Sequence, residues 1–177
     1  MSDEAFWAII ERTTALEADT DAQTRALTQA LSDLSADDII AFEIAFQRQL
    51  NSAYTWELWG AGYVAHGGMS DDGFEYFRRW LISKGRAVYQ HVLGAPDDLA
   101  DLLASDSEGP LEYEEFAYVA GDVWTSRTGQ SLDTFHERVG STFTSGEPAG
   151  EPFEEDAAHL AARYPKLWRR FGDNPID

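Results

Sequence analysis

The chain contains no cysteine, which excludes disulfide bonds and catalysis by a thiol. Positive charge is also scarce, because 13 lysines and arginines stand against 32 aspartates and glutamates and the formal net charge is −19. Nucleic acids and anionic membranes are bound through basic surfaces, so we expect neither as a partner. The acid excess is compatible with simple solubility, with a basic protein partner, or with mimicry of nucleic acid.

Long apolar runs are missing as well. No stretch approaches the length of a membrane span, and the start, MSDEAFWAIIERTT, lacks the basic segment and the apolar run of a signal peptide. We therefore expect a cytoplasmic protein. Hydrophobic residues nevertheless make up 44% of the 177 residues, which argues against disorder and suffices for a single domain over residues 1–177.

The motifs of common catalytic and cofactor sites are absent. There is no Gly-x-Ser-x-Gly nucleophile elbow, no Gly-x-x-x-x-Gly-Lys-Ser/Thr phosphate loop and no dinucleotide fingerprint. Two Asp-x-x-His pairs, Asp133/His136 and Asp156/His159, have a spacing found in di-metal helical bundles, where Glu is the usual acid. Such pairs arise readily in a chain this rich in acids, so we predict neither a cofactor nor a metal site.

Strand signals are weak throughout, because no segment alternates polar and apolar residues over a sustained length. Apolar residues recur instead at helical spacing, between residues that typically begin or end helices. The sequence therefore predicts an all-α fold, a single irregular domain of about eight or nine helices. Its clearest flexible loop is 142–152, where two glycines alternate with two prolines.

Several helix boundaries depend on glycine or proline. A long buried helix is predicted after Ser35, and its continuation as far as Tyr63 is left open because two glycines favour an interruption there. Pro110 is expected at the first position of a helix that reaches Trp124. A last helix is expected over 153–164.

A short turn rich in basic and aromatic residues, 166–171, is expected after that last helix. The segment 163–171 carries four basic residues, and the chain has many acids for them to meet. We expect this segment to bind an acidic groove of its own domain rather than a partner.

The stretch 56–93 concentrates rare residue types, with three of the six tryptophans and four of the thirteen basic residues. Gly67 and Gly68 interrupt the preceding helix, and Ser70 is a good N-cap for the next one. Asp71 and Asp72 follow in the first turn, where the helix dipole favours negative charge. Two aspartates there would repel an anion, so a cation or a hydroxyl-bearing ligand suits this turn better.

The run from Gly67 to Leu93, GGMSDDGFEYFRRWLISKGRAVYQHVL, resembles the bacterial family catalogued as domain of unknown function 4240. The glutamate-rich segment 112–116, Phe6-Trp7 and the segment 165–168 also resemble landmarks of that family. The resemblance covers most of the chain and implies a single, mostly helical domain. It implies no particular reaction and no catalytic residue.

A polar pocket is predicted near the turn formed by Gly67-Gly68 and Ser70–Asp72. Seven side chains are its candidate ligand-binding residues: Trp59, His66, Asp71, Asp72, Arg78, Glu114 and Glu115. The simpler interpretation is that the acids cap a helix and the bases occupy its solvated face. A glutamate of this set that points inward would have a raised pKa and would need a partner such as Arg78 or Arg79.

The function favoured by these features is non-enzymatic binding or protein interaction, with a small molecule or a basic protein as the partner. A hydrolase or lyase that uses Asp72 or Glu115 is the alternative. A third possibility is an acidic protein that neutralises a basic partner, with an association that weakens as salt screens it. Charge is segregated in a way that fits this third reading, since residues 94–126 contain nine acids and no base.

Overall fold

The computed structural model describes residues 1–14, 19–103, 109–140 and 146–176, and regular structure in these ranges is helical apart from one isolated β-bridge. Its elements are α1 (Asp3–Glu11), α2 (Thr20–Ser32), α3 (Ala36–Ser52), α4 (Trp56–His66), α5 (Asp71–Ser83), α6 (Arg86–Gly94), the 3-10 turn η2 (Pro96–Asp98), α7 (Leu99–Leu102), the 3-10 turn η3 (Glu115–Ala117), α8 (Val119–Thr128), α9 (Leu132–Val139), α10 (Ala157–Arg163) and α11 (Pro165–Phe171). The all-α prediction is confirmed. The predicted number of helices is wrong, because the described residues form eleven α-helices rather than eight or nine.

One additional helix arises because α3 and α4 are separate. α3 ends at Ser52, and α4 begins after Thr55, whose hydroxyl caps its first turn. The N–H of Trp56 donates to the carbonyl of Ala149 (2.9 Å), and the N–H of Ala149 donates to the carbonyl of Tyr54 (3.0 Å). A segment far along the chain thus helps to hold α3 and α4 apart, and the only local signal for the break is the Thr55 cap.

The helix predicted from Pro110 does not form at that position. Helical structure begins only at η3, and the preceding residues 109–114 are irregular. The N–H of Tyr113 donates to the carbonyl of Tyr76 on α5 (3.2 Å), and its buried hydroxyl donates to the carbonyl of Thr20 on α2 (2.5 Å). These long-range bonds outweigh the local preference of proline for a first helical position.

The end of the chain also differs from expectation. α10 begins at Ala157 rather than at residue 153, because Asp156 caps it by accepting a hydrogen bond from the N–H of His159 (2.9 Å). The segment 166–171, expected as a turn, is a helix that begins at Pro165. Proline at a first helical position loses no hydrogen bond, which is consistent with this start.

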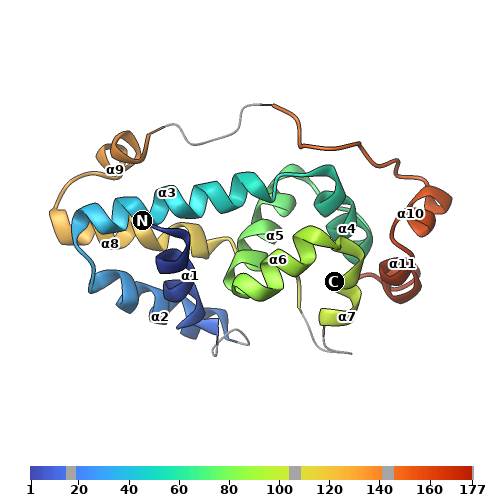
Figure 1. The fold of residues 1–177 in the computed structure, drawn as a ribbon, viewed down its shortest axis with the longest axis horizontal. Coiled ribbons are helices and arrows are strands. Elements are labelled where there is room, and N and C mark those ends of the chain that lie inside the picture. Colours follow the sequence, from blue (N-terminus) through green and yellow to red (C-terminus); the bar gives the residue numbers. More distant parts are fainter. Residues whose placement is uncertain (15–18, 104–108, 141–145, 177) are drawn as a thin grey trace.

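The helices gather at two ends of an elongated molecule, with α1, α2, α3, α8 and α9 at one end and α4 to α7, α10 and α11 at the other (Figure 1). α3 packs against α8 and α9 at the first end and contacts α5 at the second. One continuous cluster of buried apolar side chains runs through both ends. α3 is therefore the element that connects the two groups of helices.

α4 is enclosed on nearly every side, and Glu57 is the only residue from Trp56 to His66 that counts as exposed. α11, η2 and α5 pack against it. Gly60 permits the closest approach, because a Cβ atom there would lie 2.7 Å from Cζ of Tyr164, whose hydroxyl donates to the carbonyl of Glu57 (3.0 Å). α4 is apolar, but it is too short to cross a membrane. No other helix in the described ranges is long and apolar enough to do so.

The segment 146–156 runs as an extended strap along the end of the molecule that holds α4 and leads to α10 (Figure 1). Of the loop 142–152 predicted from glycine and proline, residues 142–145 lie outside the described residues. In the remainder, Ala149 forms backbone hydrogen bonds with Tyr54 and Trp56. Arg163 donates to the carbonyls of Glu151 (2.8 Å) and Pro152 (2.9 Å).

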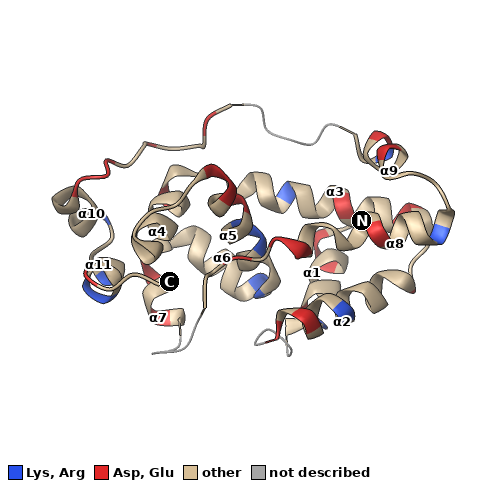
Figure 2. Cartoon of the chain, turned by 180° about the vertical axis from the view of Figure 1, so that it is seen from behind, with Lys and Arg blue, Asp and Glu red and all other residues tan. Residues whose placement is uncertain are grey.

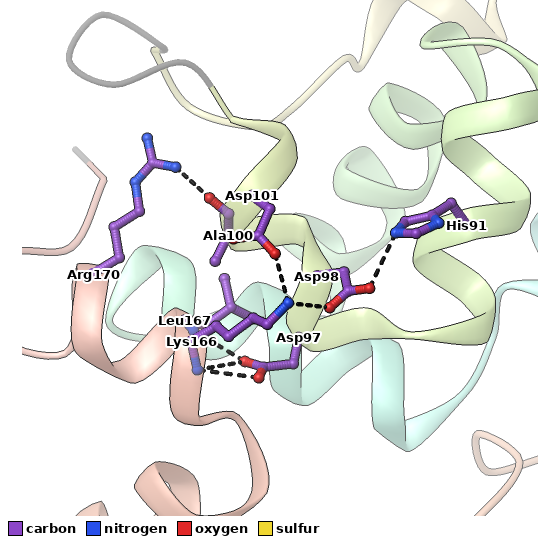
Figure 3. Close-up of polar contacts among 8 residues, drawn as sticks. All are labelled: His91, Asp97, Asp98, Ala100, Asp101, Lys166, Leu167 and Arg170. Atoms are coloured by element: carbon purple, nitrogen blue, oxygen red, sulfur yellow. Dashed lines mark hydrogen bonds and ion pairs between the residues drawn. The ribbon is translucent and has the colours of Figure 1, made fainter.

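The last helix, α11, docks on η2 and α7 through charged groups (Figure 3). Nζ of Lys166 lies 2.5 Å from a carboxylate oxygen of Asp101 and 2.6 Å from one of Asp98, and these hydrogen bonds raise the pKa of Lys166. Asp97 accepts hydrogen bonds from the backbone amides of Lys166 and Leu167, both at 3.0 Å. The prediction that segment 163–171 binds an acidic surface of its own domain is confirmed.

Arginines are used repeatedly as donors to backbone carbonyls near helix ends. Arg78 donates to the carbonyl of Leu50 on α3 (2.9 Å), and Arg170 donates to the carbonyl of Leu103 after α7 (2.8 Å). Arg127 likewise donates to the carbonyl of Ser32 at the end of α2 (3.1 Å). Acidic residues are spread over elements at both ends of the molecule (Figure 2).

Candidate ligand-binding site

Three of the predicted site residues, Asp71, Asp72 and Arg78, line a small cleft of about 200 Å³, here called the Arg78 cleft. Its other lining residues are Gln47, Leu50, Asn51, Tyr54, Phe74 and Glu75. Asp71 and Asp72 are exposed in the first turn of α5. The predicted N-cap of this helix is confirmed, because the Ser70 hydroxyl accepts a hydrogen bond from the N–H of Gly73 (3.1 Å).

Arg78 lies beside two aromatic rings that also line this cleft. Its Cζ lies 4.8 Å from the ring centre of Tyr54 and 4.9 Å from that of Phe74. Burial lowers the pKa of Arg78 from its ordinary value, although the guanidinium stays charged. Its Nε atom is buried without a hydrogen-bond partner in the protein.

Trp59 lies outside the Arg78 cleft lining and has a packing role. Its ring stacks between those of Trp56 and Phe74, with ring centres 5.2 Å and 4.8 Å away. Its Nε1 donates to the carbonyl of Met69 (3.2 Å), immediately before the Ser70 cap. Trp59 therefore supports the turn from the inside.

His66 is also separate from the Arg78 cleft, and both of its ring nitrogens are engaged. Nε2 accepts a hydrogen bond from the N–H of Leu111 (3.1 Å), so Nδ1 carries the hydrogen and donates to the carbonyl of Gly62 (3.1 Å). His66 thus joins the end of α4 to the segment that precedes η3. This arrangement leaves neither nitrogen for a ligand.

Glu114 and Glu115 lie at the start of η3, and both are exposed. The carbonyl of Glu114 accepts a hydrogen bond from Arg79 (3.0 Å), and its carboxylate accepts one from the Tyr118 hydroxyl (2.7 Å). Glu115 lines neither the Arg78 cleft nor the larger cleft described next. The seven predicted residues therefore do not converge on one pocket: three line the Arg78 cleft, Trp59 and His66 each lie elsewhere, and the two glutamates lie at η3.

The two Asp-x-x-His pairs lie far apart, because α9 and α10 are at opposite ends of the molecule (Figure 1). Asp156 is the N-cap of α10, and Asp133 is exposed in the first turn of α9. In the parts of the chain that the structure describes, no group of three or more histidine, aspartate or glutamate side chains is arranged to hold a metal ion.

A larger cleft, here called the Glu43 cleft, has a volume of about 680 Å³ and lies between α3, α5, α8 and α9. Its lining residues are Glu43, Gln47, Glu75, Arg79, Ala117, Tyr118, Gly121, Asp122, Leu132, Phe135, His136, Val139 and Gly140. Gln47 and Glu75 also line the Arg78 cleft, so these two side chains form a polar wall between the two clefts.

Glu43 is the buried carboxylate of this cleft, with only 6% of its surface exposed. Burial raises its pKa to about 7, against the opposing effects of a hydrogen bond from Gln47 and the positive charge of Arg79. Nε2 of Gln47 donates to Oε1 of Glu43 at 2.7 Å. The carboxyl group therefore exchanges its proton near neutral pH, which is common among residues of functional sites.

Arg79 is buried beside Glu43 and is held by two other groups. It forms an ion pair with Glu75 one turn earlier on α5, and it donates to the carbonyl of Glu114. Its Nε and the Oε1 of Gln47 are buried without hydrogen-bond partners in the protein. Buried polar atoms without partners are uncommon in folded proteins, and both of these belong to residues that line the Glu43 cleft.

The opposite wall of the cleft is apolar and comes mainly from α9. Leu132, Phe135 and Val139 lie along one face of that helix. Gly121 allows α9 to approach α8, because a Cβ atom at this position would come within 2.8 Å of the Leu132 side chain. Two large side chains at the cleft stay exposed, Tyr118 at 51% and Leu132 at 46%, so apolar surface remains accessible there.

Sequence reasoning did not select Glu43, although a signal for it exists. Glu43 falls four residues after Ile39 and three before Phe46, on the face of α3 that both side chains bury. An acid inside an apolar helical stripe must be buried or must open a polar cavity. The sequence does not reveal that α5 and α9 meet at this acid.

A family model described as a protein of unknown function (DUF4240) matches residues 1–126. The chain belongs to this family. The resemblance found in the sequence is thereby confirmed, and comparison with curated proteins and with solved structures gave no match. Within the Glu43 cleft, all the acidic lining residues and Arg79 lie in the DUF4240 region, whereas the apolar wall of α9 lies beyond it.

Proposed function

We propose that this DUF4240 protein is a non-enzymatic binding protein that holds a small organic ligand in the Glu43 cleft. The observation that carries the proposal is the convergence of buried polar groups from α3 and α5 on a cleft whose other wall is apolar. Ligand sites of globular proteins combine these features, a mostly apolar cavity with a few polar groups that orient the ligand. A volume of about 680 Å³ is in the range of such sites.

The polar pocket predicted near the Ser70–Asp72 turn is retained in this proposal as the neighbouring Arg78 cleft. Gln47 and Glu75 belong to both clefts, so a ligand that moves either side chain affects the other cleft as well. At about 200 Å³ the Arg78 cleft suits a small group or ion rather than a whole ligand. The Glu43 cleft is the better candidate for the main site.

Filling the cleft provides the test. A library of small organic compounds is screened by thermal shift against the wild-type chain and against Ala117→Trp, which places an indole among the lining residues. Ligands of this cleft should raise the melting temperature of the wild type and not that of Ala117→Trp. Ser126→Trp adds the same side chain at an exposed position of α8 outside the cleft lining and should respond like the wild type. Compounds that stabilise all three equally, or no stabilising compound, would refute the proposal.

Catalysis by a carboxyl group is the second candidate, and the raised pKa of Glu43 is the observation that favours it. A general acid or base works best when its pKa lies near the working pH. The hydrolase or lyase considered from the sequence used Asp72 or Glu115, but both of these are exposed. A panel of ester, amide and glycoside substrates should then reveal turnover that Glu43→Gln abolishes and Glu115→Gln leaves intact.

A basic protein partner is the third candidate. Arg78 and Arg170 are bound to backbone carbonyls of the chain, and this use leaves much of the acid excess at the surface. Pull-downs at low and high salt address this candidate, because association through exposed charge weakens steeply as salt is raised. A partner whose recovery does not change with salt would argue against it.

A further inference from the structure

We infer that the Glu43 cleft selects an organic cation with an apolar body, such as a primary amine attached to an aromatic or aliphatic group. The inference rests on the proposed function, because it names the charge class of the ligand for the same cleft. It is carried by the charges and the two unlike walls of the cleft.

Negative groups outnumber positive ones in the lining. Glu43, Glu75 and Asp122 contribute carboxylates, whereas Arg79 contributes the only guanidinium. Arg79 is already matched by Glu75, with which it forms an ion pair. The charge of Arg79 also acts on Glu43, but among the residues that the structure describes neither Glu43 nor Asp122 forms an ion pair with a basic side chain. One guanidinium therefore faces three carboxylates, and a cationic ligand would compensate the excess of negative charge.

Glu43 makes the recognition of a cation dependent on pH. The charged and titratable groups that share its cleft are Glu75 and Arg79 from α5, Tyr118 just before α8, Asp122 from α8, and His136 from α9. A bound ammonium group stabilises the carboxylate form of Glu43 and not the protonated form. The affinity for a cation should therefore rise as the pH increases through about 7, the pKa of Glu43 in the folded protein.

An organic cation fits the cleft better than a metal ion does. The acids of the described residues are not gathered into a set of three or more that could surround a metal. The wall formed by Leu132, Phe135 and Val139 offers nothing to a metal but can cover a hydrocarbon group. Burying such a group contributes roughly 25 cal/mol per Å² of apolar surface, which adds to the electrostatic attraction.

The two walls also come from different parts of the chain. The carboxylates lie within residues 1–126, which the DUF4240 family model matches, and the apolar side chains of α9 lie beyond that region. The family region would thus recognise the ammonium group. The segment beyond residue 126 would select the size and shape of the apolar body.

Three probes of similar shape test the charge class. The full chain is titrated at pH 8 with 2-phenylethylamine, 2-phenylethanol and 3-phenylpropanoate, and binding is followed by calorimetry and by the backbone amide signal of Gly121. The amine should bind about tenfold more tightly than the alcohol, which corresponds to one charge-assisted hydrogen bond, and the anion should bind most weakly.

Two substitutions assign the effect to Glu43. Glu43→Gln should lower the affinity for the amine towards that of the alcohol, while the affinity for the alcohol changes little. Glu137→Gln removes the same charge from an exposed position of α9 outside the cleft lining, and it should leave the order of the three probes intact. An unchanged ratio of amine to alcohol affinity in Glu43→Gln would overturn the inference.

The remaining outcomes separate this inference from the proposed function. If the alcohol or the anion shifts the Gly121 signal and binds as tightly as the amine, the charge class is wrong and the cleft is still a ligand site. If none of the three probes binds or shifts that signal, the inference fails together with the assignment of the cleft as a site for such ligands.

Discussion

Gln47 donates a hydrogen bond from its side-chain amide to the carboxyl group of Glu43, one turn earlier on α3, across 2.7 Å. The amide is the only hydrogen-bond partner of the Glu43 carboxyl group among the described side chains, and its own oxygen is buried without a partner. When Glu43 is protonated, the carboxyl group becomes a donor, and the Gln47 amide can turn to accept from it. The protonation of one residue and the orientation of the other are therefore coupled.

The stability of the protein should depend on pH through Glu43. Its pKa is about 7 in the folded state and lies near 4.5 when unperturbed, so the folded chain holds this proton more tightly than the unfolded chain. The stabilisation is complete below about pH 4.5 and is lost as the pH rises through 7. Glu43→Gln removes this term, so its free energy of unfolding relative to the wild type should rise by roughly 2 kcal/mol from about pH 5.5 to pH 8.

Urea denaturation at a series of pH values measures this difference. Glu137→Gln, at an exposed position, is the matched control and should follow the wild type at every pH. A constant difference between Glu43→Gln and the wild type across this range would contradict the raised pKa.

Gly60→Ala should destabilise the protein. The added Cβ atom would lie 2.7 Å from Cζ of Tyr164, so α4 and the chain before α11 must move apart or Tyr164 must leave its place. Overpacking of this kind costs about 1–3 kcal/mol. Gly94→Ala is the control, because no atom lies within 4 Å of its added Cβ and alanine is the better helix former. If Gly60→Ala and Gly94→Ala unfolded at the same urea concentration, the predicted overpacking at Gly60 would be contradicted.

Asp97→Ala should loosen α11 more than the rest of the molecule. It removes the carboxylate that accepts from the backbone amides of Lys166 and Leu167, and such a cap is worth about 1 kcal/mol. Hydrogen exchange should accelerate at these two amides, whereas Asp97→Asn keeps an acceptor oxygen and should retain most of the protection. If both substitutions left exchange at α11 unchanged, the carboxylate would not be the group that holds it.

Arg78→Lys should destabilise the protein by about 1 kcal/mol although it conserves the charge. Lysine lacks the planar guanidinium that contacts the rings of both Tyr54 and Phe74 while it donates to the carbonyl of Leu50. Thermal denaturation of each variant measures this loss. Arg169→Lys, at an exposed position of α11, should have the melting temperature of the wild type. Identical melting temperatures for both variants would mean that charge alone matters at residue 78.

Local signals in the sequence predicted many of the helix ends. Ser35 and Ser70 cap α3 and α5 as expected, and Gly67 ends α4 in the left-handed conformation that favours glycine. These ends depend on neighbouring residues alone, which explains why a single sequence is sufficient. The family resemblance likewise rested mainly on one contiguous run, residues 67–93.

Features that depend on distant segments were not predictable in this way. The break before α4 depends on Ala149, and the irregular path after Pro110 depends on the carbonyl of Tyr76. The candidate site has the same origin, because Glu43 acquires its raised pKa only where α5 and α9 close around α3. The prediction succeeded for Asp71, Asp72 and Arg78, which are close in sequence and line one cleft. It failed for Glu115, which the fold places outside that cleft.

The use of arginine as a donor to backbone carbonyls bears on how the chain can vary in evolution. Only two of its basic residues are lysines, Lys84 and Lys166. Surface arginine and lysine commonly exchange without effect, but a guanidinium that bonds a carbonyl at a helix end has a shape that an ammonium group does not reproduce. Among DUF4240 relatives, lysine should therefore replace Arg78 far less often than it replaces an exposed arginine such as Arg25.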